Sequence, residues 1–173
     1  MSKPRRSKYR LLEGDIVRID LGEGWFSFGR KLLASVWAFY DFRSRDEIAP
    51  EEIVRQPVLF KVWAGERAGL EKGAWKLLGH IPLTDEERQP VPFFKQDILD
   101  PTHIAIYMSD SLGLDSEKEE IPATWEEIQG LEDMGVWYTP YVEDRLRDHF
   151  AGRPCKWVQG PKPPKIPTGA AVH

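Results

Sequence analysis

The stretch Gly14-Asp-Ile-Val-Arg-Ile-Asp-Leu21 decides the fold class of this chain. Val17, Ile19 and Leu21 are apolar and charged residues stand between them, so the two faces of the stretch differ. An alternation with a period of two residues is typical of a β-strand that has one buried and one exposed face. The sequence that follows this strand must therefore supply its partners in a sheet.

Further strand patterns follow along the chain. Gly22-Glu23-Gly24 predicts a hairpin turn, because glycine tolerates positive φ. We expect residues 93–95 at a sheet edge, because Pro90 and Pro92 lack the N–H groups that a ladder needs. Residues 65–73 predict a loop that contains several glycines. The remaining predicted strands are 25–33, 36–42, 58–63, 75–83 and 104–108.

Helical signals are short, apart from one near the C-terminal end. A proline at the first helical position predicts a single turn at 49–53, and Thr124 with Glu127 fits a capping box that opens a second short helix. Thr139 predicts the N-cap of a longer helix. Its apolar face is formed by Val142, Leu146 and Phe150. We predict a mainly β, α+β fold: a curled antiparallel sheet or small barrel with a packed C-terminal helix.

The 173 residues are enough for one domain with a substantial core. Residues 1–10 predict a basic flexible arm, residues 11–152 a single β-rich domain, and residues 153–173 a Pro/Lys-rich flexible tail. No run of about 18 apolar residues occurs and no apolar stretch follows the basic start, so we expect neither a membrane segment nor a secretory signal. Cys155 is the only cysteine, which excludes an intramolecular disulfide and agrees with a cytoplasmic protein.

Charge is unevenly distributed along the sequence. The net charge is −4, but between Asp110 and Asp144 eleven acidic residues face a single lysine. Such a segment is either a solvated surface or an attractor of basic partners, and it repels phosphate backbones. We predict that the loop with Glu117, Glu119 and Glu120 borders a surface that binds a basic protein. We expect no nucleic acid partner.

Catalytic and metal-binding signals are weak. A binuclear hydrolase site can be assembled across loops from four residues: His80, His103, Asp97 and Asp100. No two histidines have the spacing of a local metal site, so nothing in the pattern requires this assembly. The simpler interpretation makes His80 a structural or surface residue and Asp100 a turn residue. We therefore expect no metal and no cofactor.

Three basic residues embedded in apolar strands form a second candidate for partner binding: Arg18, Arg30 and Lys95. They either line a concave recognition face or form the exposed half of alternating strands. An exposed aromatic residue near such a face would be a good interface anchor. This face is the alternative to the acidic loop as the surface that binds a partner.

Seven short blocks of the sequence carry a resemblance to a known family. They include Gly79-His80-Ile81-Pro82-Leu83 and Pro92-Phe93-Phe94-Lys95-Gln96-Asp97. All seven blocks, in order, are 14–19, 28–30, 38–41, 57–60, 79–83, 92–97 and 141–146. In these blocks the chain resembles the immunity protein 26 family of bacterial polymorphic toxin systems. The same family label is shared with a small organophosphate-hydrolysing phosphotriesterase.

The resemblance implies a mostly β domain that binds and neutralises a cognate toxin protein. It transfers no catalytic residues to this chain. The alternative that it implies, a phosphotriesterase acting on organophosphate triesters, needs a metal-activated hydroxide or an activated nucleophile. The sequence offers no recognisable residue set for either, so the immunity function is the preferred hypothesis. The oligomeric state and the identity of the toxin are left open.

Overall fold

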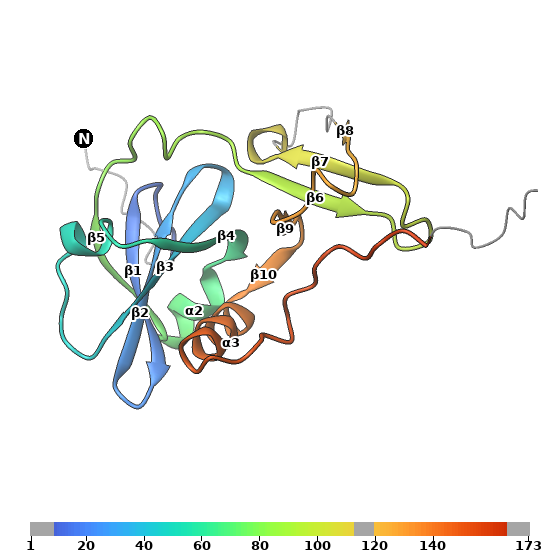
Figure 1. Ribbon diagram of the computed structural model, residues 1–173. Coiled ribbons are helices and arrows are strands. Elements are labelled where there is room, and N and C mark those ends of the chain that lie inside the picture. Colours follow the sequence, from blue (N-terminus) through green and yellow to red (C-terminus); the bar gives the residue numbers. More distant parts are fainter. Residues whose placement is uncertain (1–8, 113–119, 166–173) are drawn as a thin grey trace, which may run out of the picture.

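The computed structural model describes residues 9–112 and 120–165, and within these ranges the chain forms two β-sheets. The first sheet has six strands in the order β10-β4-β3-β2-β1-β5 (Figure 1). These strands are β1 (Asp15–Gly22), β2 (Trp25–Lys31), β3 (Val36–Ser44), β4 (Val58–Gly65), β5 (Trp75–His80) and β10 (Val136–Tyr138). The sheet curls into a half-barrel, so the predicted mainly β fold with a curled sheet and a C-terminal helix is confirmed.

Strands β1 and β2 form the hairpin that the sequence predicts. They pair antiparallel from Ile16 opposite Arg30 to Gly22 opposite Trp25. The turn between them has positive φ at Gly22 and Gly24. Glycine suits these positions because it lacks the Cβ that makes this backbone region costly.

The main hydrophobic core lies on the face of the first sheet that helix α3 (Thr139–Phe150) covers (Figure 1). Val142 and Leu146 of α3 are fully buried there against the apolar face of β1. Leu21 and Phe150 are partly buried against the same core. Each fully buried aliphatic side chain contributes roughly 1.5–3 kcal/mol. The apolar faces predicted for the first strand and for the C-terminal helix are therefore confirmed.

The opposite face of the first sheet is also covered, which the alternation along β1 did not predict. Ile16 is fully buried on that face with Phe28 of β2 and Tyr40 of β3. The predicted single turn is present as α1 (Pro50–Ile53), and its Ile53 packs on the same group. The first half of β1 is thus buried on both faces, as in a sheet with packed layers on either side.

The second sheet has four strands in the order β8-β7-β6-β9. These strands are β6 (Pro92–Gln96), β7 (Ile104–Met108), β8 (Ile121–Pro122) and β9 (Glu132–Asp133). The prediction that residues 93–95 lie at an edge is wrong, because β6 pairs with β7 on one side and with β9 on the other. The two prolines do not prevent this, since Pro90 precedes the strand and Pro92 is its first residue.

Two short strand pairs depart from the predicted antiparallel arrangement. β10 runs parallel to β4, and β9 runs parallel to β6. Because β9 and β10 follow one another closely in the chain, this segment contributes an edge strand to each sheet (Figure 1). Across the seam, Trp63 of β4 stacks on Phe93 of β6 with their ring centroids 4.4 Å apart. The seam between the sheets is therefore packed with side chains.

A short helix lies where the sequence predicts a loop with glycines. This helix, α2 (Arg67–Lys72), precedes β5, and its Gly69 packs against Trp75. A Cβ at Gly69 would stand 2.6 Å from Cγ of Trp75, so this close approach of helix and ring requires glycine. At Gly73, glycine supplies the left-handed residue that ends the helix.

The short helix predicted after Thr124 does not form. Thr124 N–H donates to Glu127 Oε2 over 2.7 Å and Glu127 N–H donates to Thr124 Oγ1 over 3.3 Å, so the capping box itself is present. Residues 125–130 nevertheless make turns. A capping box satisfies the first N–H groups of a helix but does not supply the packing that sustains a short one. α3, in contrast, includes Thr139 as its first residue and ends before Gly152.

Residues 153–165, which we call the C-terminal strap, contain neither helix nor strand. Trp157 stacks on Tyr141 of α3 with ring centroids 3.9 Å apart, and its Nε1–H donates to a carboxylate of the same helix over 2.9 Å. Farther along, the backbone of Lys162 and the side-chain amide of Gln96 exchange two hydrogen bonds of 2.6 and 2.8 Å. The strap therefore runs from α3 to β6 and is held at both ends (Figure 1).

Candidate partner-binding surface

Residues 97–103 connect β6 to β7 at the end of the second sheet, and we call this loop the hairpin tip (Figure 1). Asp97 N–H donates to His103 O, and His103 N–H donates to Asp100 O, both over 3.0 Å. The side-chain amide of Gln96 donates to Pro101 O over 2.8 Å. The hairpin tip is therefore closed by its own hydrogen bonds.

Two carboxylates fix the backbone inside the hairpin tip. Asp97 Oδ1 accepts hydrogen bonds from the N–H groups of Asp100 and Leu99, and these bonds hold the pKa of Asp97 below its usual value. Asp100 Oδ1 accepts from the hydroxyl and the N–H of Thr102, which lowers the pKa of Asp100 in the same way. Both carboxylates are ionised at neutral pH, and they act as turn-forming acceptors, as expected for Asp100 from the sequence.

Between these two carboxylates the hairpin tip presents a pair of aliphatic side chains. Ile98 and Leu99 are each 94% exposed, far more than any other large hydrophobic side chain whose exposure the structure describes. Exposed apolar side chains on a well-formed support mark sites of protein association. This pair was not predicted from the sequence, although its signal is visible there as two aliphatic residues enclosed by two turn-forming aspartates.

Charged residues that were candidates on sequence grounds surround the hairpin tip. His103 Nε2 lies 3.0 Å from Glu120 Oε1, in an ion pair if the imidazole is protonated. Exposed Lys95 on β6 lies with its Nζ 5.9 Å from the ring centroid of Tyr107. Burial, and secondarily the nearby Glu120 carboxylate, raise the pKa of Tyr107. One end of the second sheet thus combines an apolar pair with charges of both signs.

The four residues considered for a hydrolase site do not come together. Asp97, Asp100 and His103 belong to the hairpin tip, whereas His80 ends β5 in the first sheet. His80 Nδ1 lies 3.0 Å from Oδ1 of the fully buried Asp15. Among the residues that the structure describes, no group of three or more His, Cys, Asp or Glu side chains is arranged to hold a metal ion.

The recognition face proposed around three basic residues does not form either. Arg30 is only 2% exposed, because β2 lies inside the sheet and both of its faces are covered. Its guanidinium binds Glu87 and the carbonyl groups of residues 81 and 82. Arg30 therefore holds the segment between β5 and β6 in place and is not available to a partner. Arg18 lies over the Phe26 ring at 4.1 Å in the first sheet, and Lys95 lies in the second.

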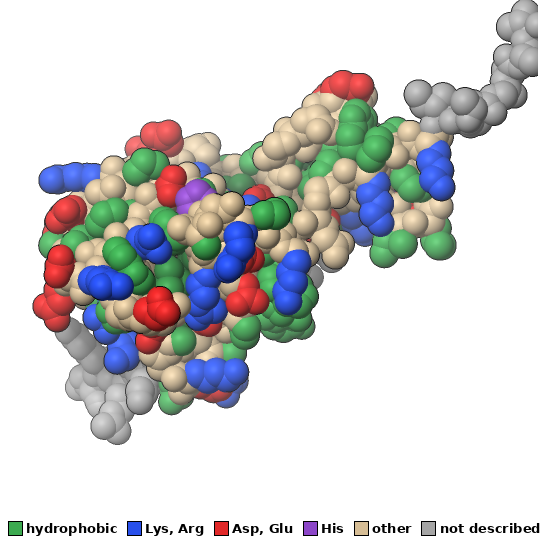
Figure 2. All heavy atoms as spheres, turned by 60° about the horizontal axis from the view of Figure 1, so that its bottom comes forward, with side chains coloured by type: hydrophobic (Ala, Val, Ile, Leu, Met, Phe, Trp, Pro, Cys, Tyr) green, Lys and Arg blue, Asp and Glu red, His purple; other side chains and the backbone are tan. Residues whose placement is uncertain are grey.

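The acidic loop is only partly within the described ranges. Glu117 and Glu119 lie outside them, and Glu120 is exposed beside His103 as stated above. On the face that Figure 2 shows, acidic and basic side chains are intermixed over the first sheet and α3. Charge alone therefore does not mark a binding site on that face.

The fold and the hairpin tip define a mainly β protein with an exposed, hydrogen-bonded apolar loop. Residues 12–103, more than half of the chain, match the family model described as immunity protein 26. The chain belongs to the immunity protein 26 family. The match includes the hairpin tip, whereas the resemblance noted at residues 141–146 lies beyond it. No curated protein and no solved structure matches the chain, and no helix in the described ranges is long and apolar enough to cross a membrane.

Proposed function

We propose that this chain is an immunity protein that binds and neutralises a cognate toxin protein. Membership of the immunity protein 26 family supports the class of function. The observation that carries toxin binding is the 94% exposure of both Ile98 and Leu99 on a loop closed by hydrogen bonds. Little conformational entropy is lost when such a loop binds, and burying each side chain contributes roughly 1.5–3 kcal/mol.

The charges beside this apolar pair fit a partner with a basic surface. Asp97, Asp100 and Glu120 carry the negative charge, and Lys95 and Lys162 are the bases nearby. Complementary charge at the rim of an interface speeds association and is screened by salt. Glu117 and Glu119, which precede Glu120 in the sequence, belong to this proposal as additional acidic groups. A cytoplasmic location and the absence of nucleic acid partners stay predictions.

The test is a binding measurement with a toxin encoded beside the gene. The double variant Ile98→Asp/Leu99→Asp should lose binding by at least about a hundredfold, because it replaces the apolar centre of the interface. Val58→Asp changes a 45% exposed aliphatic residue of the first sheet and should bind as the unaltered chain does. Equal binding by all three proteins would refute the placement of the interface at the hairpin tip.

One observation favours the alternative of a phosphotriesterase. Asp15 orients the His80 ring, and His80 lines a cleft of about 550 Å³ together with Ser35 and Lys31. Ser35 has φ 61, a left-handed backbone that a non-glycine residue adopts at some cost and that often accompanies function. With the proton on Nδ1, Nε2 of His80 would be free to take a proton from water that attacks a phosphotriester.

Turnover of diethyl 4-nitrophenyl phosphate, followed by release of 4-nitrophenolate, tests this alternative. The immunity function predicts no turnover above that of a His80→Asn variant, with or without a chelator. Turnover that disappears in His80→Asn while the melting temperature is unchanged would establish the enzyme. Turnover that disappears only with a chelator would indicate a metal site formed in solution instead.

A further inference from the structure

A cleft of about 560 Å³ opens at the free edge of the first sheet. Three segments form it: the residues that precede β1, helix α2, and the first half of β5. β5 is the last strand of its sheet and pairs only with β1. The cleft lies where the main core of the first sheet reaches the surface.

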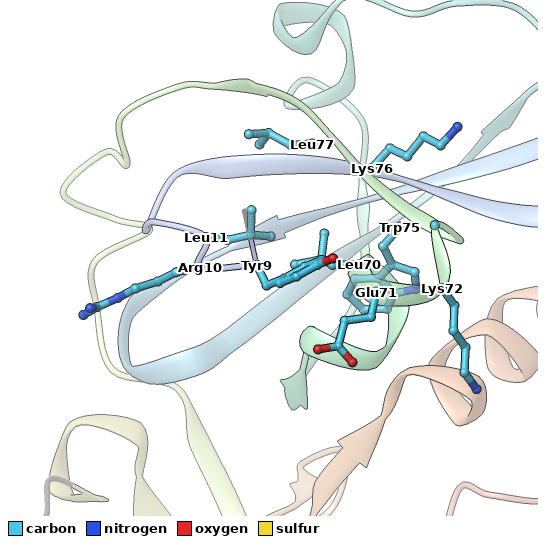
Figure 3. Close-up of a pocket in the computed structure, with 10 residues that line it drawn as sticks. Tyr9, Arg10, Leu11, Leu70, Glu71, Lys72, Trp75, Lys76 and Leu77 are labelled. Carbon is cyan, nitrogen blue, oxygen red and sulfur yellow. The ribbon is translucent and has the colours of Figure 1, made fainter. Parts of the chain in front are cut away.

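The floor of the cleft is apolar. Leu11 and Trp75 are nearly fully buried members of the main core, and Leu70 packs against them. Leu77 extends the same surface into solvent and remains 45% exposed. Figure 3 shows Leu11 and Leu70 on either side of the ring of Tyr9 and Leu77 farther away. A volume of this size with an apolar floor is typical of a site for a small organic molecule.

The rim of the cleft is basic. Arg10, Lys72 and Lys76 all line it, and Figure 3 shows their charged ends directed outward around the apolar side chains. The acidic residue of the lining, Glu71, is already bound to Arg67 with Nε and Oε1 2.7 Å apart. Lys72 and Lys76 form no ion pair with any residue in the ranges 9–112 and 120–165. Each of these two exposed cations, which Figure 3 shows on opposite sides of the cleft, is therefore available to an incoming anion.

We propose that this cleft binds an amphipathic organic anion, with its apolar body on the leucine and tryptophan floor and its anionic head at the basic rim, beside Lys72 or Lys76. The apolar floor excludes a bare inorganic anion as the preferred ligand, because such an ion would lose water without gaining apolar contact. The basic rim disfavours an amphipathic cation of the same shape. This site goes beyond toxin binding, since it lies on a different sheet from the hairpin tip and needs no protein partner.

The fluorescent aromatic sulfonate 8-anilinonaphthalene-1-sulfonate is the first probe, because its emission rises when it enters an apolar site. Octanoate and octylammonium are the matched competitors, with the same chain and opposite charge. Octanoate should displace the probe at a concentration at least tenfold lower than octylammonium. N-acetyl-phenylalanyl-leucine, which has a free carboxylate, then distinguishes a peptide C-terminus from a simple fatty acid as the preferred source of the ligand.

Variants locate the site. Lys72→Gln/Lys76→Gln should weaken octanoate binding roughly tenfold, because it removes both rim charges beside which the carboxylate could bind. Lys61→Gln/Lys165→Gln removes two lysines that do not line the cleft and should leave binding unchanged. Melting temperatures of all variants show whether the fold is intact. Equal potency of octanoate and octylammonium, or equal binding by both double variants, would overturn the proposal.

Discussion

The two sheets of this protein differ in how much of each strand is buried. The first sheet has strands of up to nine residues with packed clusters on both faces. The second combines two five-residue strands with two of only two residues, and its own cluster contains three buried residues: Phe94, Ile104 and Ile128. We infer from this difference that the first sheet supplies most of the stability, whereas the second presents the surface that we assign to binding.

Leu146→Ala should produce the largest loss of stability, because Leu146 is fully buried in the core of the first sheet. We expect the free energy of unfolding in urea to fall by about 2–5 kcal/mol. Leu99→Ala is the matched control, since it makes the same chemical change at a side chain that is 94% exposed, and it should stay within about 0.5 kcal/mol. Similar losses of stability in the two variants would contradict the inference that the core of the first sheet supplies most of the stability.

Arg30→Met should cause the second-largest loss of stability. It tests the segment between β5 and β6, which connects the two sheets. It leaves Glu87 and two carbonyl oxygens without their buried donor, and breaking such a pair by removing one partner is strongly destabilising. Glu87 is 29% exposed, so water can partly hydrate its carboxylate when Arg30 is removed. We therefore expect the free energy of unfolding to fall by about 2–4 kcal/mol in the same urea experiment. Glu87→Gln keeps an acceptor for Arg30 and should cost less. If Arg30→Met unfolds at the same urea concentration as the unaltered chain, Arg30 does not fasten this connection.

Trp157→Ala should have a smaller effect, because it releases only the C-terminal strap from α3. The variant removes both the stacking of Trp157 on Tyr141 and the hydrogen bond that Nε1 of Trp157 donates. We expect a decrease of about 1–2 kcal/mol in the free energy of unfolding. Trp157→Phe keeps an aromatic ring and should recover part of the loss. Faster amide exchange of the strap with unchanged exchange in the first sheet would show that the effect is local.

Asp133→Asn should have the smallest effect, visible as a change in pH dependence. Burial of Asp133 raises its pKa above the usual value, although a hydrogen bond from Gly135 opposes this. The folded chain therefore holds this proton to higher pH than the unfolded chain, and the carboxylate destabilises the fold as pH rises through that interval. The stability of Asp133→Asn relative to the unaltered chain should increase from pH 4 upward. A difference that does not vary with pH would show that the carboxylate of Asp133 titrates normally.

The sequence predicts the first sheet better than the second for a physical reason. Long alternating strands such as β1 carry a periodic signal, and Val142 and Leu146 carry another at helical spacing. β9 of the second sheet has two residues, which is too short for any period to appear, and the same holds for β10, the three-residue edge strand that was not predicted in the first sheet. These strands exist because tertiary packing places them beside β6 and β4.

The candidate site was predicted only in part. Asp97, Asp100 and His103 were selected for chemistry, and the structure gives the two aspartates the role of turn formers. Arg30 was assigned to the surface because alternation does not show that a strand is covered on both faces. Ile98 and Leu99 were missed because hydrophobic residues are assumed to be buried, and only the geometry of a turn exposes them.

The position of α3 has a consequence for how the chain is synthesised. Two fully buried side chains of the main core come from α3, yet the same core contains residues as early in the sequence as Leu11. A ribosome must therefore release the chain through α3 before that core can close, and until then the apolar face of the first sheet is open to water and to other chains. Contacts over such long sequence separations also slow folding. The nascent protein depends on α3 to end this period of exposure.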